Sequence, residues 1–292
     1  MPEQESGNQS VAGAGRESFG SRLGAAMAAR GPLCVGIDPH PALLKSWGLD
    51  DDAAGLRRFS LTVLEAVAPL AAAVKPQVAL YERHGSAGMA VLEEVLATTR
   101  DESVLSIADA KRGDIGSTMA AYADAWLRDG SPLAADSVTL SPYLGFESLR
   151  PALDLAAETG RGVFVLALTS NPEGASVQHV GGKDSVARRI ALAAAAENSR
   201  YAGALGSVGL VVGATVGSAL ADLELDLPAV RGPILAPGLG AQGATPADLR
   251  ATFGAAYPLV LGTSSRDILS AGPAASGLRD AALRTLDGLR GE

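Results

Sequence analysis

An apolar run in the segment SVLSIADAKRGDIGST, residues 103 to 118, is followed by charged side chains, of which Asp109, Lys111 and Asp114 could do chemistry. Side chains alternate faces along a strand, so Asp109 and Lys111 share a face. In a closed parallel barrel that face points inward at the mouth where such barrels carry their active sites. Fixed charges of both signs beside a bound molecule can stabilise charge that develops during a reaction. A solvated turn at the end of a strand explains the same residues about equally well.

The end of this strand is expected to be a turn followed by a helix. Gly113 and Gly116 favour release of the chain from the sheet. Ser117 or Thr118 is expected to cap the next helix, which would extend to Asp129.

A lysine interrupts a second apolar segment, AAVKPQVALYE, which begins at Ala72. If this segment is a strand, Lys75 and Gln77 share a face. A buried ammonium group is costly unless it is paired, so a lysine that simply reaches the surface is the weaker explanation. We therefore favour a paired Lys75 inside the fold.

The last two apolar segments carry an anion-binding pattern. In APGLGAQG, residues 236 to 243, closely spaced glycines allow backbone N–H groups to approach a phosphate. In LGTSSRDIL, Arg266 stands where a helix is expected to begin, and its guanidinium group suits the same ligand. An ordinary glycine turn would explain the first motif alone, but the pair favours a phosphate site.

Apolar segments alternate with helical patterns along most of the chain. Eight strands are expected, at 33–38, from 72, from 103, and at 137–142, 162–170, 208–215, 232–240 and 257–265. Helices are expected between them, and one more, with Phe19, Leu23 and Met27 on one face, is expected to plug the bottom of a barrel and end at Gly31. This alternation predicts the α/β class, and eight strands favour a (β/α)8 (TIM) barrel over an open sheet.

The length of 292 residues suits one such barrel, and no internal boundary is evident. Residues 1–16 are polar and are expected to be a disordered leader, which leaves 17–292 as a single barrel domain. A net charge of −8 argues against sequence-independent nucleic-acid binding, which needs a basic surface.

Cysteine and histidine usage predicts a metal-free cytoplasmic protein. Cys34 is the single cysteine, cannot form an internal disulfide, and is expected to be a small buried hydrophobic residue. The three histidines, His40, His84 and His179, do not have the spacing of metal ligands. No segment approaches the roughly 18 apolar residues of a membrane span, and no signal peptide is evident, so we expect no membrane partner.

Seven motifs, in order, resemble those of the orotidine 5′-phosphate decarboxylase family, in its longer bacterial type 2 branch. They are GIDPH, VKPQ, DAKRGDIGST, SPYLG, TSNP, APGLGAQG and SSR, and the resemblance covers most of residues 33 to 270. One departure is Ser141, where relatives often carry asparagine, so the role of that position is open.

The resemblance implies decarboxylation of orotidine 5′-monophosphate to UMP, the last step of de novo UMP synthesis, with no metal or cofactor. The broken bond leaves a carbanion at C6 with no adjacent electron sink, so fixed charge has to stabilise it. In the family pattern Lys111 lies beside C6 and donates the replacing proton, and Asp109 faces the departing carboxylate. Lys75 and Asp114 complete an alternating network of ammonium and carboxylate groups.

The resemblance also implies how the substrate is held. Asp38 and Lys75 would contact the ribose hydroxyls, Ser170 the pyrimidine amide edge, and Gln242 and Arg266 the phosphate. The remaining implied binding residues are Gln77, Thr118, Asn171, Pro237, Gly238 and Ser265. The family pattern is a homodimer in which Asp114 and Thr118 reach the substrate of the neighbouring subunit.

Two alternatives stay open on the sequence. A metal-dependent sugar-phosphate decarboxylase or aldolase of the same superfamily would place additional acids around a divalent ion, whereas the second strand carries Lys75. A catalytically silent nucleotide-binding module would keep Arg266 and the glycine segment but could lose the charge network. Activity that survives a chelator would separate the first alternative from the decarboxylase.

Overall fold

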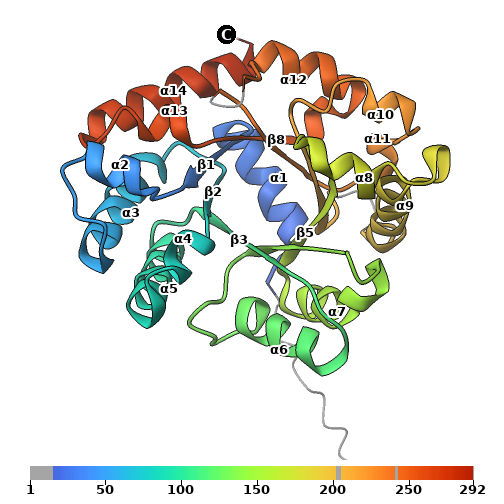
Figure 1. Ribbon diagram of the computed structural model, residues 1–292, viewed down its shortest axis with the longest axis horizontal. Coiled ribbons are helices and arrows are strands. Elements are labelled where there is room, and N and C mark those ends of the chain that lie inside the picture. The colour runs from blue at the N-terminus through green and yellow to red at the C-terminus, as the bar shows by residue number, and fades with distance from the viewer. Residues whose placement is uncertain (1–15, 202–204, 241–242, 292) are drawn as a thin grey trace, which may run out of the picture.

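The computed structural model describes residues 16–201, 205–240 and 243–291. Within them, eight parallel strands pair in sequence order and the last pairs with the first, which closes the barrel (Figure 1). The strands are β1 Leu33–Ile37, β2 Ala73–Pro76, β3 Leu105–Arg112, β4 Ser137–Leu140, β5 Gly162–Leu168, β6 Val208–Val212, β7 Ile234–Pro237 and β8 Val260–Ser264. The predicted (β/α)8 barrel is therefore confirmed.

Helices follow the strands and surround the barrel (Figure 1). The α-helices are α1 Phe19–Arg30, α2 Pro41–Ser46, α3 Ala53–Val67, α4 Ala79–Glu82, α5 Gly85–Asp101, α6 Gly116–Leu127, α7 Arg150–Thr159, α8 Ala175–Gln178, α9 Val186–Asn198, α10 Ala219–Asp222, α11 Leu227–Val230, α12 Pro246–Phe253, α13 Arg266–Leu269 and α14 Ala275–Arg290. Four 3-10 turns add η1 Phe146–Leu149, η2 Pro172–Gly174, η3 Gly182–Asp184 and η4 Gly254–Leu259. None of the helices in the described segments combines the length and apolar character of a membrane span.

The period of two along each strand divides the core into an outer and an inner layer. On β3, Ala108 and Ala110 face outward and join the large apolar layer between strands and helices. Leu105 and Ile107 face inward and pack in the barrel interior. The next inward position on the same row is Asp109, so the interior changes from apolar to charged toward the carboxyl ends of the strands.

Helix α1 closes the opposite, amino-terminal end of the barrel. Its first turn is capped by Ser18, whose side chain accepts a hydrogen bond from the Ser21 N–H. Phe19 and Leu23 are fully buried, and the Phe19 ring meets the ring of Phe164 edge to face at 5.9 Å. In Figure 1, α1 lies across the middle of the ring of helices. The predicted plug at the bottom of the barrel is confirmed.

The helix after β3 begins two residues earlier than predicted. It starts at Gly116, its N-cap residue is Ile115, and no side chain caps it, so the prediction of a Ser117 or Thr118 cap is wrong. The chain turns early because Gly116 adopts a left-handed conformation (φ 53°) and the Asp114 carboxylate accepts the Ile115 N–H at 2.8 Å.

Cys34 lies on the inner face of β1, in the apolar layer that contains Phe19 and Leu23. It is fully buried, and burial raises the pKa of its thiol to about 12. The thiol is therefore protonated and inert at neutral pH, which confirms the predicted structural role.

Candidate active site

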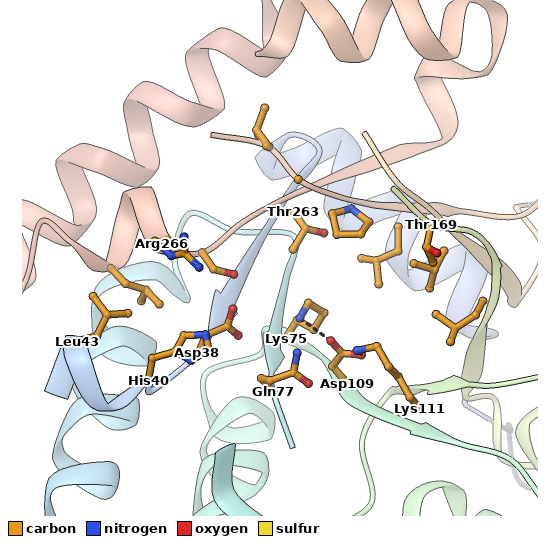
Figure 2. Close-up of a pocket in the computed structure, with 18 residues that line it drawn as sticks. Asp38, His40, Leu43, Lys75, Gln77, Asp109, Lys111, Thr169, Thr263 and Arg266 are labelled. Carbon is orange, nitrogen blue, oxygen red and sulfur yellow. Dashed lines mark hydrogen bonds and ion pairs between the residues drawn. The ribbon is translucent and has the colours of Figure 1, made fainter. Parts of the chain in front are cut away.

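A pocket with a volume of about 270 Å³ opens at the carboxyl ends of the strands (Figure 2). This is near the lower end of the range for sites that enclose small molecules, roughly 300–1,000 Å³. The site residues predicted from the sequence that line it are Asp38, Lys75, Gln77, Asp109, Lys111, Pro237, Gly238, Ser265 and Arg266. Residues far apart along the chain therefore meet in one cavity.

One wall of the pocket is a row of alternating charges. The Lys75 ammonium group donates to Asp109 Oδ2 at 2.9 Å, and the Lys111 ammonium group donates to Asp109 Oδ1 at 2.6 Å. Lys75 and Asp109 are 5% and 7% exposed, whereas the Lys111 side chain is 45% exposed. The innermost pair is thus shielded from water, and Lys111 brings the second ammonium group to the open cavity.

Burial and mutual attraction act in opposite directions on these groups. Burial alone would raise the pKa of Asp109, but the ammonium groups of Lys75 and Lys111 outweigh it and hold that pKa well below its usual range. Burial alone would lower the pKa of Lys75, but the carboxylates of Asp109 and Asp38 hold it above its usual value. Asp109 and Lys75 are therefore both charged at neutral pH.

Lys111 reaches the pocket through an unusual backbone conformation. Its φ of 48° lies in the left-handed region that residues other than glycine rarely adopt. The next residue, Arg112, ties this strand end to its surroundings, since its guanidinium group pairs with Glu82 and lies over the rings of Tyr122 and Trp126. Strained backbone at the rim of a cavity is typical of functional sites.

The opposite side of the pocket offers acceptors and a cation. Figure 2 shows Arg266 and Asp38 across the cavity from Lys111. Asp38 Oδ1 and Thr263 Oγ1 are buried and find no hydrogen-bond partner within the described residues. Such groups are costly unless a ligand satisfies them, which indicates that this side accepts donors such as hydroxyl groups. Gly36 makes room for Ser265 there, because a Cβ would lie 1.8 Å from Ser265 Oγ.

Ser170 and Asn171 line an adjoining hollow that shares Thr169 and Pro237 with the main pocket. The Asn171 amide group donates to Glu173 at 3.0 Å and its oxygen accepts the Thr169 hydroxyl at 2.6 Å. These two predicted residues therefore border the site without lining its main cavity. Gln242, predicted as a phosphate ligand, lies outside the described residues.

Asp114 and Thr118 do not line the pocket of their own chain. Asp114 lies in the turn after β3, and Thr118 is exposed in the first turn of α6. The structure therefore leaves these two residues apart from the Lys75–Asp109–Lys111 row.

Several pocket residues were not predicted from the sequence. The polar ones are His40, Thr169 and Thr263, and the apolar ones are Leu43, Leu166, Val211, Leu235, Leu239 and Leu269. A signal for Thr263 was present, because the inward row of β8 runs from Leu261 through Thr263 to Ser265 with a period of two. His40 lies in the GIDPH segment two residues after Asp38, but its residue type and spacing did not predict a role in the site.

Within the described residues, no group of three or more His, Cys, Asp or Glu side chains is arranged to hold a metal ion. Of the two carboxylates that line the pocket, Asp38 and Asp109, the second is paired with two ammonium groups. The described residues of this site therefore carry ammonium and carboxylate groups that pair with one another, and they do not form a set of metal ligands.

Fold and site together define a class: a (β/α)8-barrel protein whose mouth holds buried charges of both signs and, apart from them, an arginine that lines the same pocket. The model of the orotidine 5′-phosphate decarboxylase / HUMPS family matches residues 31–279. The chain belongs to this family.

Named relatives and solved structures agree with that assignment. The chain is 58% identical to orotidine 5′-phosphate decarboxylase of Salinispora arenicola, over 92% of this chain and 96% of that protein. It is 56% identical to the Streptomyces coelicolor protein of the same name, over 92% and 95%. A crystal structure from Streptomyces avermitilis, provisionally described as this enzyme, superposes with a TM-score of 0.91 at 55% identity, covering 97% of this chain and 99% of that one. The structure of Leishmania donovani OMP decarboxylase superposes with a TM-score of 0.75 at 32% identity, covering 94% of this chain and 98% of that one.

Proposed function

We propose that this protein decarboxylates orotidine 5′-monophosphate to UMP and carbon dioxide, without a metal or cofactor. The observation that carries the proposal is the buried Lys75–Asp109–Lys111 row, which stands intact in a chain more than half identical to proteins named for this activity. The row supplies the fixed charges that a reaction without an electron sink requires.

The substrate would span the pocket from Arg266 to Lys111. The phosphate would bind Arg266, Gln242 and the backbone near Gly238 and Ser265, because guanidinium and N–H groups suit an anion. The ribose would lie over Asp38 and Lys75, where the unpartnered Asp38 oxygen accepts a hydroxyl. Gln77 would line the pocket beside Lys75, Pro237 would wall the ring, and Ser170 and Asn171 would meet its amide edge from the adjoining hollow.

The chemistry would follow from where the carboxylate of the substrate is placed. Next to Asp109 it meets a carboxylate that stays ionised, and departure as carbon dioxide removes that repulsion. The electron pair of the broken bond stays on C6, beside the Lys111 ammonium group. Lys111 then transfers a proton to C6 and regains one from water. Each step uses charges that are oriented before the substrate binds, which is the most efficient form of electrostatic stabilisation.

We further propose a homodimer in which Asp114 and Thr118 serve the pocket of the partner subunit. Both residues stand outside the pocket of their own chain. The exposed apolar side chains Ile115, Tyr143 and Leu144 lie on the two neighbouring turns after β3 and β4, which is consistent with a covered surface there. Closed twofold symmetry would complete both sites at once.

A complementation experiment tests the shared site. Chains with Lys111→Ala and chains with Asp114→Ala should each be nearly inactive, but unfolding and refolding an equal mixture should restore on the order of a quarter of wild-type activity. About half of the dimers would be mixed, and one of the two sites in each would be intact. The matched control mixes Lys111→Ala with Asp109→Ala, whose residues touch within one chain and should not complement. Inactive Lys111/Asp114 heterodimers would refute the shared site.

The activity itself is tested by the ultraviolet absorbance of orotidine 5′-monophosphate with purified protein in EDTA. We expect the absorbance of the substrate to change to that of UMP, and the Lys111→Ala protein to leave it almost unchanged. No change with the wild-type protein would refute the proposed function. A change that occurs without EDTA and is abolished by it would contradict decarboxylation without a metal.

We also propose that the protein works in the cytoplasm, where its single buried thiol needs no oxidising environment. Cell fractionation followed by the same absorbance assay tests this. Activity confined to a secreted or membrane fraction would contradict it.

A further inference from the structure

The pairing of β3 with β4 is irregular between Ala108 and Arg112, the segment that carries Asp109 and Lys111. Ala108 pairs with Val138, and the next pair is Arg112 with Leu140. Three β3 residues, 109 to 111, therefore face a single β4 residue, Thr139. The two extra residues on β3 form a bulge. Bulges are common beside active sites, where they redirect side chains.

The side chain of Thr139 fills the gap that this bulge leaves in the ladder. Its Oγ1 accepts the backbone N–H of Lys111 at 2.9 Å. The same Oγ1 lies 2.9 Å from Asp109 Oδ1, to which it donates. Because Thr139 is 1% exposed, water does not compete for either bond.

The direction of both bonds is determined by counting protons. A hydroxyl group has one hydrogen, and the Lys111 N–H can only donate. Asp109 is held ionised by two ammonium groups, so it can only accept. The Thr139 hydrogen therefore points at Asp109, and the hydroxyl group joins the strained Lys111 backbone to the carboxylate between the two lysines.

We propose that Thr139 is a positioning residue for the charge row, a role that rests on the proposed decarboxylase activity. Asp109 Oδ2 is held by Lys75, and Oδ1 is held by both Lys111 Nζ and Thr139. Thr139 resists rotation of the carboxylate and keeps Lys111 in its left-handed conformation. A hydroxyl group at this position is needed for both bonds, whereas the methyl group is not.

The test compares Thr139→Val, which keeps the shape, with Thr139→Ser, which keeps the hydroxyl group. We expect Thr139→Val to lower kcat by about 10- to 100-fold, the loss typical of a hydrogen bond to a charged group. The dissociation constant of UMP should change less than about threefold, because misplacement of Asp109 and Lys111 acts on the reacting centre. Thr139→Ser should retain kcat within about threefold of wild type, since it can make both bonds.

Ser137→Ala is the matched control. Ser137 is on the same strand and fully buried, and its hydroxyl group has no partner within the described residues. Its removal should leave kcat unchanged, so an equal loss in Ser137→Ala and Thr139→Val would overturn the inference. An unchanged kcat in Thr139→Val, or an equal loss in Thr139→Ser, would also overturn it.

Two further outcomes remain decisive. If Thr139→Val does not fold, Thr139→Ala replaces it, and failure of both to fold while Thr139→Ser is normal would assign the residue to folding and overturn a role in positioning. If the wild-type protein does not convert orotidine 5′-monophosphate, the proposed function fails instead. The kcat of Thr139→Val is compared with that of wild type only if the wild type is active. Failure of the positioning role is therefore distinguishable from failure of the proposed function.

Discussion

The two ends of the barrel use charge in opposite ways. At the amino-terminal end, arginines surround an apolar plug, and their partners include backbone carbonyls as well as acids. Arg22 pairs with Asp136 and donates to the Gly160 carbonyl, and Arg161 pairs with Asp129 and donates to the Ala135 carbonyl. At the mouth, Lys75, Asp109 and Lys111 are held mainly by one another. The interactions at the amino-terminal end join elements of the fold, whereas those at the mouth hold charged groups beside a cavity.

The contrast separates residues whose loss should lower stability from residues whose loss should lower activity. Side chains at the plug pack against other buried side chains or bind backbone carbonyls. Their loss should therefore lower the free energy of unfolding and leave the turnover of the folded protein unchanged. Side chains at the mouth leave buried acceptors such as Asp38 Oδ1 without partners, an arrangement that costs stability and anticipates a ligand. Their loss should lower activity far more than stability.

The largest expected effect is at Lys111. Lys111→Ala should lower kcat by about 10²–10⁴, or about 2.7–5.4 kcal/mol, because it removes the group that we propose as the proton donor and as the cation beside the reacting carbon. Single-turnover kinetics measures this, and UMP binding and the melting temperature should change little. A kcat near that of wild type would remove Lys111 from the mechanism and with it the contrast between the two ends.

Next is the plug. Phe19→Ala should lower the free energy of unfolding by about 3–5 kcal/mol, because it removes a fully buried ring that packs against Phe164. Urea denaturation measures the change. In conditions where the protein stays folded, kcat should match that of wild type. If kcat and stability fell together, the plug would be coupled to the site and the separation of the two ends would not hold.

A smaller effect is expected at Arg266. Arg266→Ala should lower kcat/KM for orotidine 5′-monophosphate by roughly 10–100-fold, the loss of a hydrogen bond to a charged group, while the phosphate-free nucleoside should lose nothing further. Arg279→Ala, on the exposed side of α14, is the control and should be neutral. Equal losses for the two substrates would show that Arg266 does not bind the phosphate.

The smallest effect concerns pH. The folded pKa of Asp109 is lowered, so its contribution to stability is complete above the unfolded value of 3.8 and is lost as the pH falls through the folded value. The difference in the free energy of unfolding between wild type and the double variant Lys75→Met/Asp109→Asn, which leaves no buried ammonium group unpaired, should stay constant from about pH 8 to about pH 5 and move against wild type below about pH 4. Urea titrations at each pH measure it. A change near neutral pH would mean that Asp109 is not ionised in the folded protein.

Local patterns in the sequence predicted most of the fold. All eight strands and the plug helix were expected because apolar periodicity reports which face of an element is buried. Helices of a single turn such as α4 and α10 were not predicted because four residues are too few to show a period, whereas the helix start expected at Arg266 is confirmed by α13. The cap expected at Ser117 or Thr118 failed because the turn at Asp114 and Gly116 began the helix earlier.

For the site, sequence patterns were enough to predict the chemical groups and the end of the barrel at which they gather. Asp109 and Lys111 share a face because strand side chains alternate, and Lys75 and Gln77 share one for the same reason. Polar residues such as Arg266 follow their strands, and parallel strands bring their carboxyl ends to one mouth. None of this requires knowledge of how one strand is aligned with the next.

Which of these groups touch one another follows from the three-dimensional arrangement of the strands. The contact of Lys75 with Asp109 depends on the register of β2 against β3, and the place of Thr139 depends on the bulge in the pairing of β3 with β4. The left-handed conformation of Lys111 and the unpartnered oxygen of Asp38 likewise arise from neighbours distant in the chain. Register is a property of pairs of strands, set by packing and hydrogen bonds summed over the whole barrel, so no single segment of sequence encodes it.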